Sequence, residues 1–416
     1  MSERTRAAQW LAHIAADPNR TIDRVLTDGE STPLERNLVY GVARHYFSLK
    51  AWVSQFLSKP LRDKDQDVFH LLLVGAYQLQ YLDIPIHAAV NETVSAASGL
   101  RKPWARALVN GVMRNLARSD SYERSFDMPE WLRKQLESQY EAAQDLMHAM
   151  NERAPMCLRI NTRQTTVDAY LAGLPNAHQR TWQPETIVLD TPTSQTSLPG
   201  YHEGEVAVQD AGAQCAAALL ELPETPTTWL DACAAPGGKL FHGLERYPDA
   251  RAHAVELSPK RAAALAEQAE RLGHSDRFDL HIGDATQPER WWDGTLYDCI
   301  LVDAPCSGTG TLRRNPDIKL HRTQEDLVQL TGLQTALLDR LWPLLKPGGS
   351  LLYCTCSILR QENDAIIEQF LTTASGAQVV PLHLPTGQAT HHGWQLLPTD
   401  PRTDGFFFAR LEKGAT

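Results

Sequence analysis

From residue 228 to the end of the chain, short apolar runs alternate with amphipathic helical patterns. The expected strands are residues 228–233, 252–257, 278–283, 298–303 and 350–354, and an apolar run at 406–411 adds a last strand. The expected helices are residues 239–245, 259–272, 326–345 and 363–372. Strands that alternate with helices pair in parallel through right-handed crossovers, and the helices cover both faces of the sheet. The pattern therefore predicts a Rossmann-like α/β domain.

The residues before this region predict two further parts, since 416 residues exceed what one core usually supports. Residues 1–125 contain successive helical patterns, among them a long one from Pro33 to about Leu57, and these predict an all-α bundle. Residues 126–222 contain amphipathic helices and then short strand-like runs, which predict a helical linker and a small α/β subdomain. Residues 223–416 form the third part.

The composition is that of an ordinary globular protein, with 43% hydrophobic and 22% charged residues. No apolar run reaches the roughly 18 residues of a membrane helix, and the N-terminus shows no signal-peptide core, so a cytoplasmic protein is expected. Seven cysteines, mostly in or beside expected strands, argue against a disulfide framework. Cys354 and Cys356 are too closely spaced for a zinc knuckle and have no companion pair, so no metal is expected.

The front of the chain is more basic than the rest. Residues 1–125 carry 16 basic and 13 acidic side chains, whereas the remainder carries 24 and 37. Trp104 is surrounded by a basic cluster that consists of Arg101, Lys102, Arg106, Arg114 and Arg118. Basic side chains beside an aromatic ring suit RNA, although a solvated helix face has the same pattern. His87, in the same region, is expected to be a structural or capping histidine.

Acidic residues end three successive strands, and a glycine turn follows the first strand. The turn comprises Cys233, Ala234, Ala235, Pro236, Gly237, Gly238 and Lys239. Its glycines allow close approach to a ligand, and the helix that follows offers free N–H groups. Glu256 is placed to bind a ribose diol, Asp284 an adenine amine, and Asp303 ends the fourth strand. Without a dinucleotide fingerprint or a Walker loop, the set predicts an adenosine-bearing ligand without a pyrophosphate, and S-adenosylmethionine fits best.

Two cysteines follow strands at the same edge of the expected sheet. Cys306 lies in the turn after Asp303, and Cys356 follows the strand at 350–354, on the same side as Cys354 because strand residues alternate. A thiolate that adds to carbon 6 of a pyrimidine makes carbon 5 nucleophilic toward a methyl donor. The base must be unstacked to be reached, and Asp303 could bind its N3/N4 edge. The conspicuous turn first suggests Cys306 as the nucleophile, but the chemistry leaves the roles of the two thiols open.

These motifs resemble those of the RsmB/NOP family of RNA cytosine-C5 methyltransferases. The resemblance is carried by Asp231–Lys239, Asp303–Gly310 and Thr355–Ser357. Residues 312–319 are similar to the segment after the Pro-Cys motif in the bacterial branch that acts on small-subunit (16S) ribosomal RNA. Residues 36–42, 87–92 and 109–114 resemble a NusB-like helical domain, and residues 158–162 and 404–407 resemble the flanking motifs. The resemblance thus covers nearly the whole chain.

The resemblance implies a class I methyltransferase domain at 223–416, an all-α NusB-like RNA-binding domain at 1–125, and a small intermediate α/β subdomain. It implies methyl transfer from S-adenosylmethionine to C5 of a cytosine in 16S ribosomal RNA. The oligomeric state does not follow from the sequence, and a monomer is favoured. Cys356 would be the nucleophile, Cys306 would aid product release, and Asp303 would complete the catalytic set. Cofactor contacts would come from Cys233 to Lys239 and from Glu256, Asp284 and Asp303. Leu240 replaces the usual hydroxyl residue, and Glu256 stands where Asp is common.

Four alternatives compete with this hypothesis. A DNA cytosine-C5 methyltransferase would not need the second cysteine or the helical front domain. A non-catalytic RNA-binding or antitermination factor would not need the full motif set. A dithiol redox protein built on Cys354 and Cys356 has the wrong spacing. Within the main class, transfer RNA is the second candidate substrate.

Overall fold

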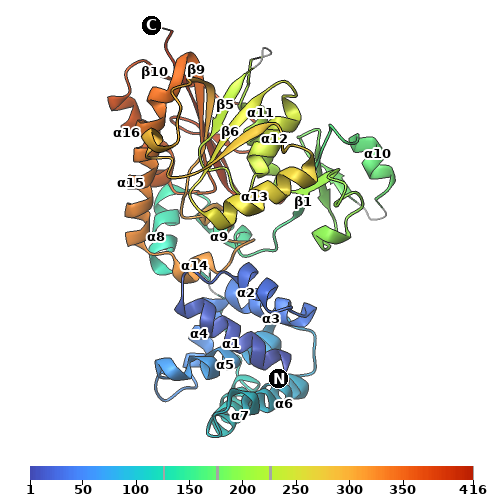
Figure 1. Cartoon of the computed structure of the whole chain (residues 1–416). Coiled ribbons are helices and arrows are strands. Elements are labelled where there is room, and N and C mark those ends of the chain that lie inside the picture. Colours follow the sequence, from blue (N-terminus) through green and yellow to red (C-terminus); the bar gives the residue numbers. More distant parts are fainter. Residues whose placement is uncertain (125–126, 175–177, 224–226, 416) are drawn as a thin grey trace. The chain divides into compact units, whose positions relative to one another are not determined.

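The computed structural model describes residues 1–124, 127–174, 178–223 and 227–415 (Figure 1). The chain divides into two units, the first formed by Met1–Glu152 and Leu312–Thr323, the second by Arg153–Thr311 and Gln324–Thr416. The three-part division with boundaries after residues 125 and 222 stays a prediction. Among the described residues, no helix combines the length and the apolar character needed to cross a membrane.

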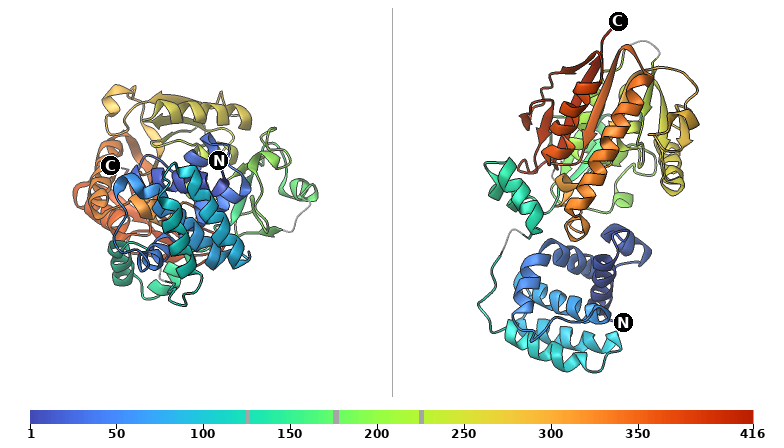
Figure 2. Two further views of the ribbon diagram at one scale, coloured as in Figure 1. Left: turned by 90° about the horizontal axis from the view of Figure 1, so that it is seen from below. Right: turned by 90° about the vertical axis from the view of Figure 1, so that its left-hand side faces the viewer.

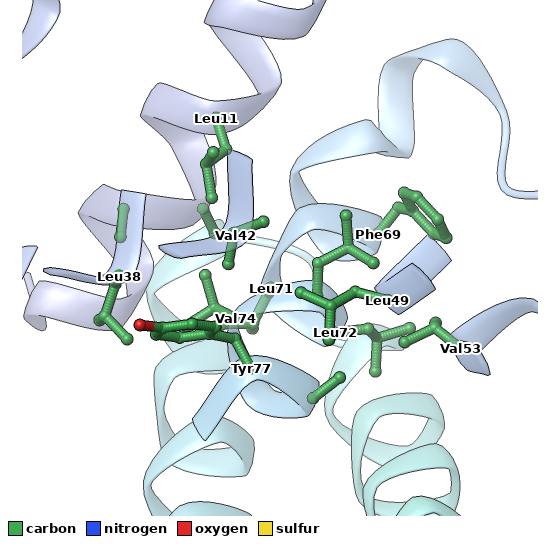
Figure 3. Packing of buried hydrophobic residues seen from close by; sticks show 14 of the residues in the cluster. Leu11, Leu38, Val42, Leu49, Val53, Phe69, Leu71, Leu72, Val74 and Tyr77 are labelled. Atoms are coloured by element: carbon green, nitrogen blue, oxygen red, sulfur yellow. The ribbon is translucent and has the colours of Figure 1, made fainter. Parts of the chain in front are cut away.

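The first unit is helical, as expected. Its helices are α1 (Glu3–Ala16), α2 (Ile22–Asp28), α3 (Pro33–Arg44), α4 (Tyr46–Ser54), α5 (Gln66–Tyr81), α6 (Ile86–Ala96), α7 (Ala105–Leu116), α8 (Glu130–Gln139), α9 (Ala143–Ala149) and the short α14 (Ile318–His321). Helix α5 packs against α1, α3, α4, α6 and α7, so its apolar residues are buried almost all round. Leu72 and Val74 of α5 belong to the same buried core as Leu11, Val42 and Leu49 (Figure 3).

The single helix expected from Pro33 to about Leu57 is wrong, because the chain breaks at His45 between α3 and α4. The expected start is confirmed: Thr32 and the N3 residue Glu35 form a reciprocal capping box. The break is explained by Asp127, whose carboxylate accepts the Ser48 N–H at 2.8 Å and lies 3.2 Å from Nδ1 of His45. An amide in the first turn of α4 is thereby satisfied by a residue distant in the sequence.

The second unit begins with a small sheet, which confirms the expected α/β subdomain. Its strands are β1 (Met156–Ile160), β2 (His178–Arg180), β3 (Thr186–Leu189) and β4 (Val206–Val208), paired antiparallel in the order β2-β3-β1-β4. Helix α10 (Val167–Ala172) contributes Tyr170 to a core with Leu158, Ile187 and Val206.

A nine-stranded sheet forms the rest of the second unit, in the order β11-β12-β13-β9-β8-β5-β6-β7, with β10 beside β13. Its strands are β5 (Thr228–Asp231), β6 (Arg251–Glu256), β7 (Phe278–Ile282), β8 (Tyr297–Asp303), β9 (Leu345–Thr355), β10 (Ala377–Val380), β11 (Gln388–Ala389), β12 (Trp394–Leu396) and β13 (Phe406–Lys413). Strands β5 to β9 are parallel, as the alternation predicted. The last strand, β13, runs antiparallel to β9, so the sheet as a whole is mixed.

Helices cover both faces of this sheet (Figure 2). One face packs against α11 (Ala211–Leu219), α12 (Gly238–Arg246) and α13 (Pro259–Leu272), and the other against α15 (Gln324–Leu341) and α16 (Asp364–Thr373). Trp229 lies in the first of these cores and Leu230 in the second, because neighbouring strand residues point to opposite faces. The parallel strands all end at one edge, where open α/β sheets bind ligands.

Candidate active site

The glycine turn between β5 and α12 has the geometry that its sequence predicted. Gly237 precedes α12 with a φ of 99°, in the left-handed region, and a Cβ there would lie 2.2 Å from the Phe241 ring. The Ala235–Pro236 peptide bond is cis. A residue other than glycine at position 237 would be both strained and crowded. The turn therefore brings bare backbone to the ligand edge of the sheet.

The acids at the ends of β6 and β7 are held by local hydrogen bonds. Glu256 is buried, accepts the Ser258 N–H at 2.9 Å, and lies 3.4 Å from Nη1 of Arg261. Asp284 accepts the backbone N–H and hydroxyl of Thr286 at 2.9 and 2.7 Å. Burial alone would raise the pKa of Asp284, but these bonds bring it below its ordinary value. An ionised carboxylate in a fixed orientation can accept a hydroxyl or an amine donor of a ligand.

Asp303, at the end of β8, pairs with the lysine of the glycine turn. Its Oδ2 lies 2.6 Å from Nζ of Lys239, and its Oδ1 lies 3.5 Å from the Cys354 sulfur. Burial would lower the pKa of Lys239, but the charges of Asp303, Cys354 and Cys356 raise it above its ordinary range. Lys239 therefore remains a cation, with its charge close to the thiol of Cys356.

Cys306 and Cys356 lie side by side although they are 50 residues apart, with 3.4 Å between their sulfur atoms. Backbone bonds hold the two loops together: the Gly310 N–H donates to the Cys356 carbonyl, and the Gly405 N–H donates to the Gly310 carbonyl, both at 2.9 Å. A Cβ at Gly310 would lie 2.1 Å from the Gly405 carbonyl oxygen, so only glycine allows this approach. The structure thus brings together the two thiols that the sequence singled out.

The surroundings of the cysteines differ. The hydrogen bond with Cys356, burial, and the nearby charges of Cys356 and Glu362 raise the pKa of the Cys306 thiol well above its usual value. Burial raises the pKa of Cys354 and of Cys233 as well. A thiol with a raised pKa is a poor nucleophile at neutral pH, because the thiolate is the reactive form.

Known protein families match the chain over most of its length. The NusB family matches residues 1–118, a ferredoxin-like domain of RsmF/B-like methyltransferases matches 128–196, and the 16S rRNA methyltransferase RsmB/F family matches 217–412. The ribosomal RNA small subunit methyltransferase B of Pseudomonas syringae pv. tomato is 42% identical over 439 residues, which cover 99% of this chain and 97% of the relative. The chain belongs to this methyltransferase family.

Solved structures show the same fold. The crystal structure of PH0851 has a TM-score of 0.85 at 21% identity, and each chain covers 99% of the other. The structure of NSun6 from Pyrococcus horikoshii with SFG has a TM-score of 0.63 at 19% identity, covering 69% of this chain and 98% of that one. At these identities the likeness concerns the fold of the methyltransferase alone.

Sequence reasoning did not single out Asp231, which lies at the same edge of the sheet. It ends β5, is fully buried, and accepts the Cys233 N–H at 3.3 Å. Burial and the charge of Asp303 raise the pKa of Asp231 to about 7. A signal was present, because Asp231 stands at a strand end in the same way as Glu256 and Asp303.

Arg159 of β1 was also missed, although it supports the glycine turn. Its Nη1 donates to the Gly238 carbonyl at 2.8 Å and to Gln209 at 2.5 Å. Its Nε and Nη2 bind the two oxygens of Glu245 at 2.8 and 2.7 Å, and the whole side chain is buried. Arg159 therefore ties the small sheet to the first turn of α12.

Two expectations for the first unit need correction. Lys102 does not extend the exposed basic cluster, because its Nζ pairs with Asp67 and lies 3.3 Å from Asp65. His87, expected to be structural or capping, is exposed in the first turn of α6, whose N-terminus has no side-chain capping hydrogen bond. Within the described part of the chain, no group of three or more His, Cys, Asp or Glu side chains could hold a metal ion.

Proposed function

We propose that this methyltransferase transfers a methyl group from S-adenosylmethionine to C5 of a cytosine in 16S ribosomal RNA. The supporting observation is the pair of thiols 3.4 Å apart, beside Lys239 and Asp303, at the carboxyl edge of the sheet. Transfer to an oxygen or a ring nitrogen needs no thiol, whereas C5 of cytosine becomes nucleophilic through a covalent adduct. The choice of small-subunit ribosomal RNA as substrate is based on the names of the curated relatives, which are ribosomal RNA small subunit methyltransferases.

The residues at this edge fit S-adenosylmethionine. The bare backbone at Gly237 allows close approach, and the carboxylates of Glu256 and Asp284 suit the ribose hydroxyls and the adenine amine. When bound, the cofactor supplies an electrophilic methyl group. The cofactor set proposed from the sequence, Cys233 to Lys239 with the strand-end acids, is retained in this proposal.

In the proposed cycle, the Cys356 thiolate forms a bond to C6 of the cytosine, and the ring electrons move to C5. Asp303 binds the N3/N4 edge of the ring and orients it, because its carboxylate can accept a hydrogen bond from the N4 amine. After C5 gains the methyl group, its proton passes to a base such as solvent water. The electron pair of that C–H bond re-forms the C5–C6 double bond, and the Cys356 sulfur leaves C6 as a thiolate. Cys306, held as a thiol 3.4 Å from the leaving sulfur, stabilises the returning thiolate by a hydrogen bond.

Cys356→Ala should abolish both methyl transfer and the covalent complex with RNA, because no other thiol occupies its position. Incorporation of labelled methyl groups and denaturing gel electrophoresis measure the two effects. Cys215→Ala, which removes a buried thiol in α11, is the matched control and should stay active. Full activity of Cys356→Ala would exclude this mechanism.

Cys306→Ala should accumulate a covalent RNA complex, because adduct formation survives while release slows. A denaturing gel after a single turnover, with RNA that carries the target cytosine, would show the trapped species. Normal turnover without trapping would remove the release role from Cys306.

Bisulfite sequencing of RNA from cells with and without the protein tests the substrate. We expect one cytosine of 16S ribosomal RNA to lose its methyl group when the protein is absent. Loss of a transfer RNA signal instead would favour the second candidate substrate, and no loss in any RNA would favour a non-catalytic factor.

A further inference from the structure

Each of the two thiols is followed by a serine, and both serines bind the same buried carboxylate. Glu362 is fully buried, and its Oε2 accepts hydrogen bonds from the hydroxyls of Ser307 and Ser357, both at 2.5 Å. Its Oε1 accepts the backbone N–H of Ser307 at 2.7 Å. One side chain therefore fastens the Cys306 loop to the Cys356 loop.

Further donors complete the surroundings of this carboxylate. Nε2 of Gln334 lies 3.2 Å from Oε1 of Glu362 and also donates to the Pro305 carbonyl at 2.9 Å. The hydroxyls of Thr309 and Ser357 lie 3.1 Å apart, so the two loops also touch directly. An ionised carboxylate is an acceptor only, and this set of hydroxyl and N–H donors matches it.

The charges around the thiol pair are arranged with opposite signs on its two sides. The charge of Glu362 acts on Cys306, whereas the Lys239 cation interacts with Cys356. Negative charge beside Cys306 disfavours a second negative charge there and raises the pKa of its thiol.

We propose that Glu362 is a positioning residue, which holds the two thiols in contact and keeps the shared proton on Cys306, so that Cys356 carries the negative charge. The inference rests on the proposed function for its role in the cycle, and it concerns which of two neighbouring sulfurs is the nucleophile. It assigns to Glu362 a part that the motifs around the cysteines do not reveal.

The test compares Glu362→Gln, which keeps the shape and most hydrogen bonds but removes the charge, with Glu362→Ala, which removes both. The full-length protein, without RNA, is treated with iodoacetamide over a range of pH, and peptide mapping gives the labelling rates of Cys306 and Cys356. In the unmodified protein Cys356 should react faster. In Glu362→Gln the ratio of the Cys356 rate to the Cys306 rate should fall about tenfold, which corresponds to one pKa unit. Labelling of Cys306 should then begin at a pH about one unit lower than in the unmodified protein.

Glu368→Gln, which removes an exposed carboxylate on α16, is the matched control and should keep the ratio. An unchanged ratio in a folded Glu362→Gln variant would overturn the proposal, even if Glu362→Ala fails to fold. The labelling needs neither RNA nor turnover. Its failure is therefore distinguishable from the failure of the C5 mechanism, which Cys356→Ala tests.

Discussion

At the scale of single residues, Arg159 shows how a buried charge supports a ligand turn. Arg159→Met should destabilise the protein by about 3–5 kcal/mol, because Glu245 would remain buried without its partner. Affinity for S-adenosylmethionine should also fall, since the Gly238 carbonyl loses its donor. Chemical denaturation and calorimetric titration measure the two effects.

The double variant Arg159→Met/Glu245→Gln is the control for this prediction. It removes the uncompensated charge, so stability should partly return while cofactor affinity stays reduced. Equal stability of Arg159→Met and the unmodified protein would show that the buried pair contributes little.

The chemistry of the candidate site could largely be predicted from residue types. Gly237, the strand-end acids and the two cysteines each lie in a local sequence pattern that requires a particular backbone conformation or a particular chemical group. Glu362 could not be predicted, because a glutamate just before a helix gives no sign that it will accept bonds from serines that follow two different cysteines. Its partner Ser307 lies 55 residues away.

At the scale of elements, the segment 312–323 has the most unexpected position. It follows the Pro-Cys motif in the sequence, yet it belongs to the helical first unit. Lys319 of α14 is buried there and donates to the Arg44 carbonyl at 2.7 Å and to Asn151 at 2.6 Å. Burial lowers the pKa of Lys319 from 10.5 to about 7.

This lowered pKa predicts a pH dependence. Between pH 7 and 10.5 the unfolded chain keeps the Lys319 proton more often than the folded protein does, so stability rises with pH through this window. From pH 7 to pH 9 the free energy of unfolding should rise by about 2 kcal/mol, and Lys319→Met should lose this increase. Urea denaturation at the two pH values measures it, with Lys346→Met, at a half-exposed lysine, as the control. A rise that is equally large in Lys319→Met would assign it to other groups.

At the scale of the whole molecule, an acidic chain with a net charge of −10 must bind a polyanion through a local basic surface. Arg101 and Arg106 are exposed near Trp104, whose surface is 45% exposed. The double variant Arg101→Gln/Arg106→Gln should weaken RNA binding. The slope of log affinity against log salt concentration should become shallower by the amount that corresponds to about two lost phosphate contacts.

Binding isotherms at several salt concentrations test this surface. Arg340→Gln, at an exposed arginine of α15, is the control and should leave the salt slope unchanged. If the double variant binds RNA as the unmodified protein does, the basic cluster is only a solvated helix face.

The sequence by itself determined the alternation of the parallel strands β5 to β9 with their helices, the glycine turn and the acids at the strand ends, but not the short strands β10, β11 and β12. These features depend on periodicity and on backbone demands within a few residues. Only the tertiary structure decided three features. They are the break at His45, the packing of residues 312–323 within the helical unit, and the contact between Cys306 and Cys356, whose loops are joined by Glu362. Each of these depends on groups far apart in the chain, whose hydrogen bonds and burial exist only after the chain has folded.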